Sequence, residues 1–419
     1  MRQITTANII AIGTELLTPY RTDTNSLYLT ARLNEIGIDV TSKSIVGDDV
    51  RDLERAVAAA LDHADVVITS GGLGPTADDL TREAVSSVLG LTMTEDPALV
   101  EQLRERFARR KAVMPEINRR QAMVPRGATV LPNPRGSAPG LLIARGEQII
   151  VLFPGPPREL EPMFVASVVD ALSARTEGRR LRRRVIKIAG QPESKVDQVA
   201  APIYSAFVDG VVPVATTILA SPGQVELHVS ARGVDIPAMD AQLDDVVGRL
   251  TAALGDSVFS TDGRAMEVVV GEALRARGLT IALAESCTGG LIAARLTEVP
   301  GSSAYVLGGV VSYANAVKHE QLGVAATTLQ TYGAVSEQAA AEMATGVRER
   351  LRADVGLAVT GIAGPDGGSD EKPVGTVCFA VAGPGDALVT DRRVVPGDRQ
   401  LIRAWSVMVA LDLVRRAVR

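Results

Sequence analysis

The sequence of 419 residues has few of the side chains on which metal sites and histidine-dependent catalysis depend. It contains two cysteines, Cys287 and Cys378, and no CxxC pair, so neither a disulfide framework nor a thiolate zinc site is indicated. The three histidines, His63, His228 and His319, are too few and too scattered to favour a Ser-His-Asp triad or a multi-histidine metal centre. Any catalytic base or metal ligand is therefore expected to be a lysine or a carboxylate.

The chain also lacks a long apolar segment. It has no run of about 18 apolar residues, the length that a membrane-spanning helix needs. The N-terminus has no basic stretch followed by an apolar core, as a signal peptide would have. Hydrophobic residues make up 46% of the sequence and charged residues 22%, and the net charge of −5 argues against general nucleic-acid binding. We therefore expect a folded cytoplasmic protein with no membrane partner and no nucleic-acid partner.

The first 172 residues alternate short apolar runs with amphipathic segments. The apolar runs at 8–17, 64–76 and 147–157 end in Gly or Pro, whereas 25–37, 50–64 and 97–110 carry apolar residues at helical spacing. Repeated strand-then-helix order predicts a parallel sheet that is covered on both faces. Ligands bind such sheets beyond the carboxyl ends of the strands, which is where the Gly-rich loops fall in this sequence.

Two further units follow in this α/β chain. Residues 175–184, RTEGRRLRRR, are interpreted as a linker or a sheet edge; their six arginines could contact nucleic acid, but a solvated charge run is favoured. Residues 180–260 form a small α+β pattern without a cluster of catalytic residue types, which we interpret as a spacer or dimerisation element. Residues 262–419 alternate strands and helices again. The predicted domains are therefore 1–172, 180–260 and 262–419.

The stretch AESCTGG, residues 284–290, joins an apolar strand pattern to an amphipathic helix pattern. A helix N-terminus has backbone N–H groups without intrahelical partners, and its dipole favours negative charge. Ser286 in this place is by default an N-cap residue. It becomes a candidate nucleophile if the fold also supplies a base, an oxyanion site and groups that hold the substrate. Cys287 is a rival nucleophile, which we expect to pack toward the core.

The rest of the C-terminal unit offers such groups. Tyr313 ends a strand pattern and Lys318 follows it; a lysine acting as base needs a pKa lowered by about 3 units, or about 4 kcal/mol, which burial can supply. The alternative is that Lys318 is a surface lysine that opens a helix. Thr360 ends another strand before Gly361 and its Gly-rich neighbours. Arg399 lies in the first turn of the last helix, where a cation is unfavourable, so it is expected to face an anion such as phosphate.

The N-terminal unit contains a second candidate site. Residues 70–74, SGGLG, follow a buried strand pattern and can direct backbone N–H groups at phosphate oxygens. Asp78 and Asp79 come shortly after, and Glu15 follows another strand, so three carboxylates could gather around a hard divalent cation. The alternative for one of the two aspartates is to cap the helix that follows.

Long stretches of the C-terminal unit, residues 284–324, 333–348 and 359–377, resemble the C-terminal domain of the CinA family. The resemblance implies hydrolysis of the carboxamide of nicotinamide mononucleotide to the acid, with release of ammonia and without a cofactor. It implies Ser286 as nucleophile and Lys318 as its base. The N–H groups at 287–290 are expected to hold the oxyanion. The residues expected to support or bind the substrate are Tyr313, Thr360, Thr288, Gly289, Gly290, Gly361 and Arg399.

The first 172 residues resemble the molybdopterin-binding-like domain of the same family through IGTELL, DTN, TSGGLGPTADDLTREA, NPRGSAPG and FPGPPREL. In CinA-type proteins this three-layer domain is associated with metal-dependent hydrolysis of the pyrophosphate of ADP-ribose. A divalent metal ion is therefore expected at Glu15, Asp78 and Asp79. Pro19 stands close to where the family usually carries a glycine, and it restricts the backbone near Glu15 and Asp23. The expected ligand-binding residues are Gly13, Thr14, Asn25, Ser70, Gly71, Gly72, Gly74, Ser137 and Gly155.

Two other functions remain open at this point. In the first, the N-terminal domain binds a pterin or a nucleotide without hydrolysing it. In the second, the protein is a competence or DNA-repair adaptor. The favoured function is that of a hydrolase of pyridine nucleotides, whose partners are small nucleotides, and which we expect to form a homodimer.

Overall fold

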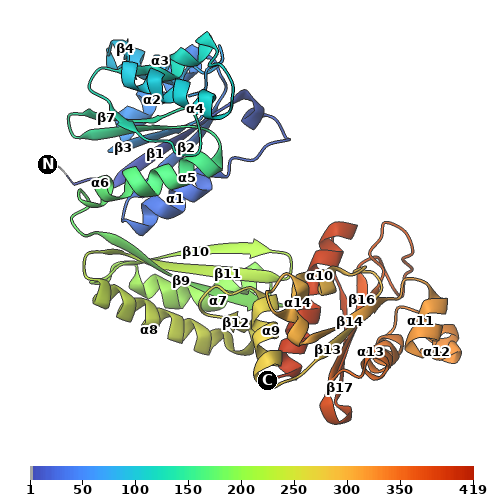
Figure 1. Cartoon of the computed structure of the whole chain (residues 1–419). Coiled ribbons are helices and arrows are strands. Elements are labelled where there is room, and N and C mark those ends of the chain that lie inside the picture. The colour runs from blue at the N-terminus through green and yellow to red at the C-terminus, as the bar shows by residue number, and fades with distance from the viewer. Residues whose placement is uncertain (1–2) are drawn as a thin grey trace. The chain divides into compact units, whose positions relative to one another are not determined.

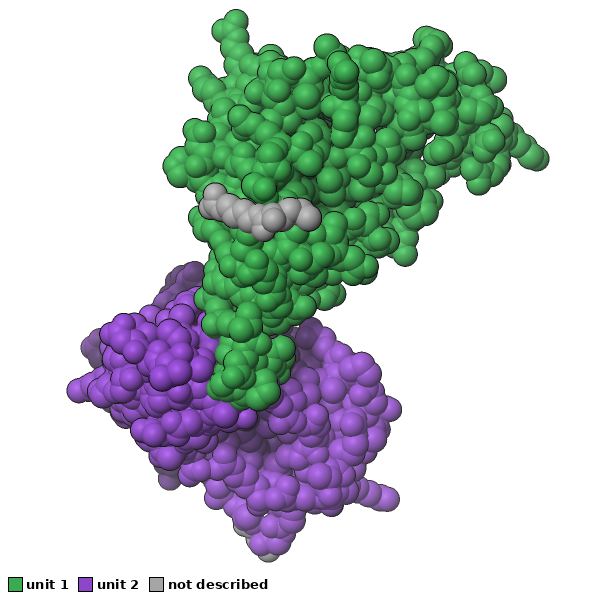
Figure 2. All heavy atoms as spheres, turned by 90° about the vertical axis from the view of Figure 1, so that its left-hand side faces the viewer, with its two compact units in different colours: residues 1–182, 232–239 green, residues 183–231, 240–419 purple. Residues whose placement is uncertain are grey.

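The computed structural model describes residues 3–419, which fold as an α/β protein with two compact units. One unit holds residues 1–182 and 232–239, and the other holds residues 183–231 and 240–419 (Figure 2). No helix among the described residues is long and apolar enough to cross a membrane. The second unit contains two separate sheets. The first unit contains one large sheet and a small two-stranded sheet.

The large sheet of the first unit has the strand order β2-β1-β3-β8-β7-β6. Its first four strands are parallel, whereas β6 and β7 run antiparallel at one edge. The predicted parallel sheet is wrong at that edge, because a two-residue turn after Arg145 lets β7 fold back on β8 as a hairpin. The strands are β1 (Thr6–Ile12), β2 (Asp39–Val46), β3 (Val66–Ser70), β6 (Thr129–Leu131), β7 (Gly140–Arg145) and β8 (Gln148–Phe153).

Helices cover both faces of this sheet, which gives the three layers that the sequence predicts (Figure 1). Buried leucines of α1 and α5 pack on one face, and those of α2 with the small side chains of α3 pack on the other. Helix α4 buries its apolar side chains in a small cluster of its own. The remaining elements are α1 (Asn25–Glu35), α2 (Val50–His63), α3 (Thr81–Leu89), α4 (Pro97–Arg109), α5 (Pro157–Ser167), α6 (Val169–Ser173), β4 (Met93–Glu95), β5 (Met123–Pro125) and the 3-10 turns Thr14–Leu17 and Glu116–Ala122.

The second unit begins with a sheet of order β10-β11-β9-β12. Strand β9 starts at Arg180, inside the stretch predicted to be a linker or an edge, and it lies between two other strands. The linker alternative is wrong for residues 180–184, which belong to β9, whereas the pairing with β12 covers only Lys187 and Ile188 and does not reach the arginine run. Arg184 forms ion pairs with Asp240 and Asp244 of α8, which compensates its charge within the fold. The elements are β9 (Arg180–Ala189), α7 (Glu193–Tyr204), β10 (Val214–Ser221), β11 (Gln224–Gly233), α8 (Ile236–Leu254), β12 (Val258–Ser260) and the 3-10 turns Ser205–Phe207 and Gly255–Ser257.

The last sheet has the order β14-β13-β15-β16-β17, with β14, β13 and β15 parallel and the other two antiparallel. Helices α9, α10 and α14 pack on one face, and α13 packs on the other (Figure 1). The elements are α9 (Met266–Ala276), β13 (Ile281–Glu285), α10 (Leu291–Thr297), β14 (Val306–Val311), α11 (Asn315–Leu322), α12 (Ala326–Thr331), α13 (Glu337–Leu351), β15 (Val355–Gly361), β16 (Thr376–Ala382), β17 (Leu388–Val394), α14 (Arg399–Ala417) and the 3-10 turns Ser302–Ala304 and Pro384–Asp386.

The register of this sheet places three chain segments at one edge. Glu285, the last residue of β13, lies opposite Val311 of β14 on one side and Val359 of β15 on the other. The residues that follow these positions therefore emerge side by side at the carboxyl ends of parallel strands, where α/β sheets bind ligands. They include Ser286 and Thr360, which lie far apart in the sequence.

Candidate functional site

The centre of the C-terminal site is a contact between Lys318 and Ser286. Helix α11 carries Lys318 into the protein, where the side chain is 1% exposed and its Nζ lies 3.1 Å from Ser286 Oγ. The same Nζ donates to the carbonyl oxygens of Ser312, at 2.6 Å, and Tyr313, at 3.4 Å. The surface position that was the alternative for Lys318 is therefore wrong.

The surroundings of Lys318 favour its neutral form. Burial lowers the pKa of Lys318 from its ordinary value, and no carboxylate of the described residues forms an ion pair with it. A neutral amine has two N–H bonds and one lone pair. If the N–H bonds donate to the carbonyls of Ser312 and Tyr313, the lone pair is left for the hydroxyl of Ser286. This is the arrangement in which a lysine accepts a proton from a serine.

Glu285 holds the loop that carries Ser286. Its buried carboxylate accepts hydrogen bonds from the N–H groups of Gly290, Ile292 and Ala293 at the N-terminus of α10. Sequence reasoning missed this role, although a carboxylate that ends a buried strand is a signal for it. The carboxylate does what an N-cap residue does, and it places a negative charge at the positive end of the helix.

The hydrogen bonds of this loop occupy some of the N–H groups that were expected to hold the oxyanion. The N–H of Gly289 donates to the carbonyl of Ser286, and that of Gly290 donates to Glu285. Neither is free for a ligand, so the expectation that all N–H groups from 287 to 290 serve an oxyanion is wrong. Within the described chain, the N–H groups of Cys287 and Thr288 donate to no backbone acceptor.

Arg403 holds the loop from the other side, and it too was missed. Its Nε lies 3.1 Å from the carbonyl oxygen of Cys287, and its Nη2 lies 2.9 Å from that of Thr288. Arg403 stands four residues after Arg399 on α14, so the two side chains lie on one face of the helix. This spacing in the sequence was the signal that could have found it.

Cys287 packs into the core, as predicted. It belongs to the hydrophobic cluster beneath the sheet, and burial raises the pKa of its thiol to about 12. At neutral pH the side chain is therefore a thiol, which is a far weaker nucleophile than a thiolate.

A cavity of about 270 Å³ opens beside Ser286, and we call it the Ser286 cavity. Arg399 donates to the hydroxyl of Tyr313 at 2.8 Å and to the carbonyl of Gly364 at 2.9 Å, and Thr360 donates to the carbonyl of Ala334 at 2.8 Å. The predicted residues that line the cavity are Ser286, Tyr313, Lys318, Thr360, Gly361 and Arg399. Thr288, Gly289 and Gly290 do not line it, whereas Asn315 and Asp366, which were not predicted, do.

A second cavity, of about 370 Å³, lies in the first unit, and we call it the Gly-rich cavity. The predicted residues that line it are Gly13, Glu15, Gly71, Gly72, Gly74, Asp78, Asp79, Ser137 and Gly155. Gly71 and Gly72 have φ angles of 114° and 65°, which side-chain-bearing residues rarely adopt, so the loop needs glycine there. Asp48, Gln121 and Glu159 also line the cavity, and sequence reasoning missed them.

Three predicted residues brace the Gly-rich cavity from behind instead of lining it. Thr14 donates to Asp48 through its N–H and its hydroxyl, both at 2.8 Å. The amide of Asn25 donates to Ser70 Oγ and to the carbonyl of Gly155, both at 2.7 Å. These bonds join the loop after β1 to the loop after β2, and the start of α1 to the end of β3 and the loop after β8.

The carboxylates of this cavity do not form a ready-made metal site. Asp79 accepts from the N–H of Gly74 at 2.7 Å and from the N–H and hydroxyl of Thr76 at 2.9 and 2.5 Å, so it shapes its own loop and caps no helix. Residues 3–419 contain no group of three His, Cys, Asp or Glu side chains arranged to hold a metal ion. The lining carboxylates therefore fit a cation held by one or two of them and mainly by ligand oxygens and water, as Mg²⁺ often is.

Comparison with known proteins assigns both parts of the chain. Residues 263–418 match the model of the CinA C-terminal domain, and residues 8–174 match that of a probable molybdopterin binding domain. A CinA-like protein of Koribacter versatilis (strain Ellin345) is 47% identical over 417 residues, which cover 98% of this chain and 99% of that protein. The chain belongs to the CinA family. The resemblance seen in its motifs is confirmed.

Two further proteins to which the chain is similar have other names. A putative competence-damage inducible protein of Desulforudis audaxviator (strain MP104C) is 45% identical over 98% of this chain and 98% of its own length. The solved structure of competence/damage inducible protein CihA from Agrobacterium tumefaciens is 44% identical and covers 37% of this chain and 94% of its own, with a TM-score of 0.36. In this CinA-family chain the Ser286 cavity lies in the matched C-terminal domain, and the Gly-rich cavity lies in the matched molybdopterin-binding domain.

Proposed function

We propose that the C-terminal domain hydrolyses the carboxamide of nicotinamide mononucleotide to the carboxylate and releases ammonia. The observation that carries the proposal is the 3.1 Å contact between the buried Lys318 amine and the Ser286 hydroxyl at the edge of a cavity. A Ser-Lys pair suits this chemistry, because the lysine activates the serine without a histidine. The membership in the CinA family supports the same reaction.

The reaction begins when Ser286 Oγ attacks the carboxamide carbon while Lys318 takes the hydroxyl proton. The N–H of Cys287, which lines the cavity, then holds the negative oxygen of the tetrahedral intermediate. Lys318 returns its proton to the amide nitrogen, so that ammonia leaves and an ester to Ser286 remains. Water, deprotonated by the same lysine, hydrolyses the ester to the acid and restores the serine.

The far side of the cavity suits the phosphate of the substrate. Arg399 points there from the first turn of α14, and its contacts with Tyr313 and the Gly364 carbonyl hold it in place. A guanidinium binds phosphate through paired hydrogen bonds, which neither Tyr313 nor Asn315 can supply alone.

Ammonia release from nicotinamide mononucleotide by the purified chain tests this function. Ser286→Ala is expected to reduce kcat on the order of 10⁴-fold or more, because it removes the nucleophile. Cys287→Ala is the matched control, since it changes the neighbouring side chain on the same loop, and most of the activity is expected to remain. The reverse ranking of the two variants would make Cys287 the nucleophile and would refute the Ser-Lys assignment.

For the N-terminal domain we propose metal-dependent hydrolysis of the pyrophosphate of ADP-ribose. The observation that favours it is the Gly-rich cavity, where the loop of Gly71, Gly72 and Gly74 lies beside Glu15 and Asp78. Backbone N–H groups of such loops bind phosphate oxygens; those of Gly71 and Gly74 already donate to the carbonyl of Phe153 and to Asp79, which leaves those of Gly72 and Leu73 for a phosphate. A divalent cation held by one or two of the carboxylates would screen the phosphate charges and activate water.

Incubation with ADP-ribose and Mg²⁺, followed by detection of AMP, separates this function from ligand binding alone. If ADP-ribose or a pterin binds without being cleaved, the domain is a binding module. The adaptor function predicts nucleic-acid binding instead, and an electrophoretic mobility shift at physiological salt tests for it. The ion pairs of Arg184 within its own fold argue against the arginine run as a free nucleic-acid surface.

A further inference from the structure

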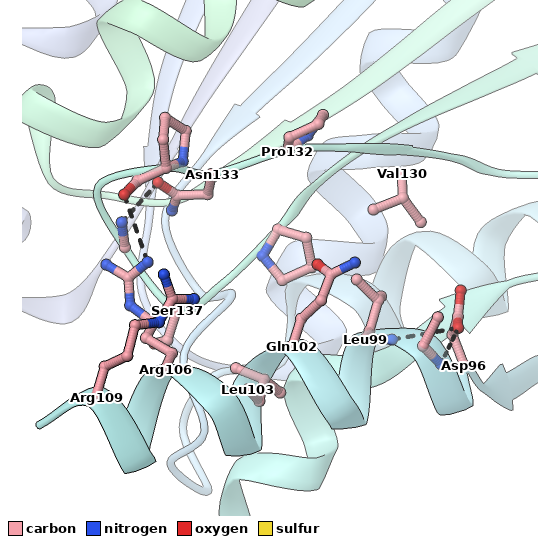
Figure 3. A pocket seen from close by; sticks show the side chains of 14 residues that line it. Asp96, Leu99, Gln102, Leu103, Arg106, Arg109, Val130, Pro132, Asn133 and Ser137 are labelled. Carbon is pink, nitrogen blue, oxygen red and sulfur yellow. Dashed lines mark hydrogen bonds between the residues drawn. The ribbon is translucent and has the colours of Figure 1, made fainter. Parts of the chain in front are cut away.

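Beside the Gly-rich cavity, the first unit contains two more hollows with arginines around them. The larger, of about 590 Å³, lies between α4 and the chain segment 130–139, and we call it the α4 cavity (Figure 3). The smaller, of about 230 Å³, adjoins the C-terminal end of α4. The arginines that line one or both hollows are Arg106, Arg109, Arg110, Arg135 and Arg158, which we call the arginine cluster.

The arginine cluster forms no ion pair with any carboxylate of the described residues. Arg106 and Arg135 donate only to backbone carbonyls, at 3.4 Å. By contrast, Arg104 on the same helix pairs with Glu101, and Arg119 and Arg120 nearby pair with Glu95 and Glu83.

Grouping these arginines has an electrostatic cost. The pKa of Arg106 is lowered, first by its partial burial and then by the positive charges of Arg110 and Arg109. Glu159 is the one carboxylate that lines the smaller hollow, and a single negative charge does not balance the four arginines that line it. A bound anion would lower the repulsion, and guanidinium groups bind phosphate through paired hydrogen bonds.

The other end of the α4 cavity has a different character. Leu99, Leu103 and Val130 line it together with prolines of the 132–139 segment, and Gln102 lies on the wall formed by α4 (Figure 3). Apolar walls with one or two amide groups suit a nucleobase or a ribose, and the volume falls within the range of about 300–1,000 Å³ that small ligands occupy. The cavity therefore combines a wall for a nucleoside with a cationic end.

The three hollows of this unit meet at one residue. Ser137 lines the Gly-rich cavity, the α4 cavity and the smaller hollow, and Glu159 lines two of the three. In Figure 3, Ser137 lies at the Arg106 end of the α4 cavity, away from Asp96. A ligand whose diphosphate lies on the Gly-rich loop therefore passes the arginine cluster as it extends along α4.

We propose that the arginine cluster is a second phosphate site, which binds a phosphoryl group of a nucleotide other than the diphosphate at the Gly-rich loop. The ligand class is a nucleoside diphosphate that carries a further phosphate on its nucleoside half. The phosphate site does not depend on the proposed hydrolysis of ADP-ribose. The inference that the bound phosphate belongs to a nucleotide does rest on that proposal.

Binding of inorganic tripolyphosphate to the full chain, measured by calorimetry without metal, tests the phosphate site. Arg106→Gln combined with Arg110→Gln is expected to weaken binding at least tenfold, since it removes charge-assisted hydrogen bonds to the phosphates. Arg135→Gln with Arg158→Gln, on the opposite wall, is expected to have the same effect. Arg104→Gln is the matched control on α4 and is expected to bind as the unchanged chain does. Equal binding by all four proteins would overturn the site.

A second titration identifies the carrier of the phosphate. The unchanged chain is expected to bind 2′-phospho-ADP-ribose at least tenfold more tightly than ADP-ribose, with hydrolysis prevented by EDTA. This preference is expected to vanish in the Arg106/Arg110 double variant and to persist in Arg104→Gln. Equal affinities in the unchanged chain would overturn the nucleotide as carrier and leave free polyphosphate as the source. If ADP-ribose is neither bound nor cleaved while the double variant loses tripolyphosphate, the proposed hydrolysis fails and the phosphate site is supported.

Discussion

The Ser286 cavity and the Gly-rich cavity differ first in how far their ionisable groups lie from water. Lys318 is 1% exposed and Ser286 is 8% exposed, and the lysine amine contacts both the serine hydroxyl and the carbonyl of Ser312. Glu15 and Asp78 of the Gly-rich cavity are exposed. A general base needs its proton removed near neutral pH, and burial does this for a lysine. Carboxylates that act with a cation and phosphates need to stay ionised, and exposure to water favours that.

The two loops are held by similar combinations of contacts. A buried carboxylate, Glu285, holds the loop of Ser286 from within, and a guanidinium from a distant helix, Arg403, holds it from the other side. The Gly-rich loop is likewise held from within by Asp79, which bonds to Gly74 and Thr76, and from a distant segment by Asn25, whose amide donates to Ser70 Oγ. Each loop therefore combines a local contact with a long-range one, and the two sites differ in burial and charge instead.

The largest expected contrast is the response to chelation. EDTA is expected to abolish cleavage of ADP-ribose and to leave ammonia release almost unchanged, because the proposed deamidation uses Lys318 and backbone N–H groups and no metal. The two reactions are measured on one preparation, as AMP and as ammonia, and added Mg²⁺ is expected to restore the first. Loss of both activities in EDTA would mean that a metal takes part at Ser286, and the Ser-Lys mechanism would have to be abandoned.

The next largest effect is expected from the buried lysine. Lys318→Met should reduce deamidation about 10²–10⁴-fold, the usual contribution of a general base, and should leave AMP formation unchanged. Lys318→Arg should not rescue it, because a guanidinium does not give up its proton at these pH values. Lys195→Met, at an exposed position, serves as the control for loss of a lysine. A Lys318→Met protein with near-normal ammonia release would exclude the lysine as base.

The pH dependence of deamidation is the next test. Below the pKa of its general base, kcat/KM is expected to change about tenfold per pH unit. Burial lowers the pKa of Lys318, so its neutral form becomes populated at a pH below its ordinary pKa. Only the neutral amine accepts the serine proton, hence kcat/KM should rise with pH up to the lowered pKa and level off above it. The same limb should appear in Cys287→Ala, because the thiol that this variant removes stays neutral in this range. A limb that disappears in that variant would assign the titration to the thiol.

The smallest expected effects come from the two arginines of α14. Arg399→Met should raise KM about 10–100-fold with little change in kcat, since it removes a charge-assisted contact with the substrate phosphate. Arg403→Met should instead lower kcat more than it raises KM, because Arg403 holds the loop of Ser286 and does not line the cavity. Steady-state kinetics of the two variants measure the split. If both variants changed kcat and KM in the same way, the two arginines would share one role.

The sequence predicted most of the secondary structure. It also predicted many of the residues that line each cavity, but not the residues that hold the loop of Ser286. The helices expected at 25–37, 50–64 and 97–110 form as α1, α2 and α4, because apolar residues at helical spacing give each helix one face to bury. The hairpin of β7 and β8 was missed, since a two-residue turn changes the direction of a strand without changing its apolar pattern. Neither Glu285 nor Arg403 was found, because their roles depend on which loop faces them in space.

By itself, the sequence determined which chemistries the protein can perform. Two cysteines and three histidines leave lysine and carboxylates as the reactive groups, and the strand-to-loop motifs place serine and glycine at the carboxyl ends of strands. The tertiary structure decided which of these groups lie in contact and away from water. Lys318 is 32 positions from Ser286 in the chain, and only the parallel pairing of β13 with β14 and the packing of α11 bring them into contact away from water. A pKa depends on the surroundings of a group, and those surroundings come from segments that are distant in the sequence.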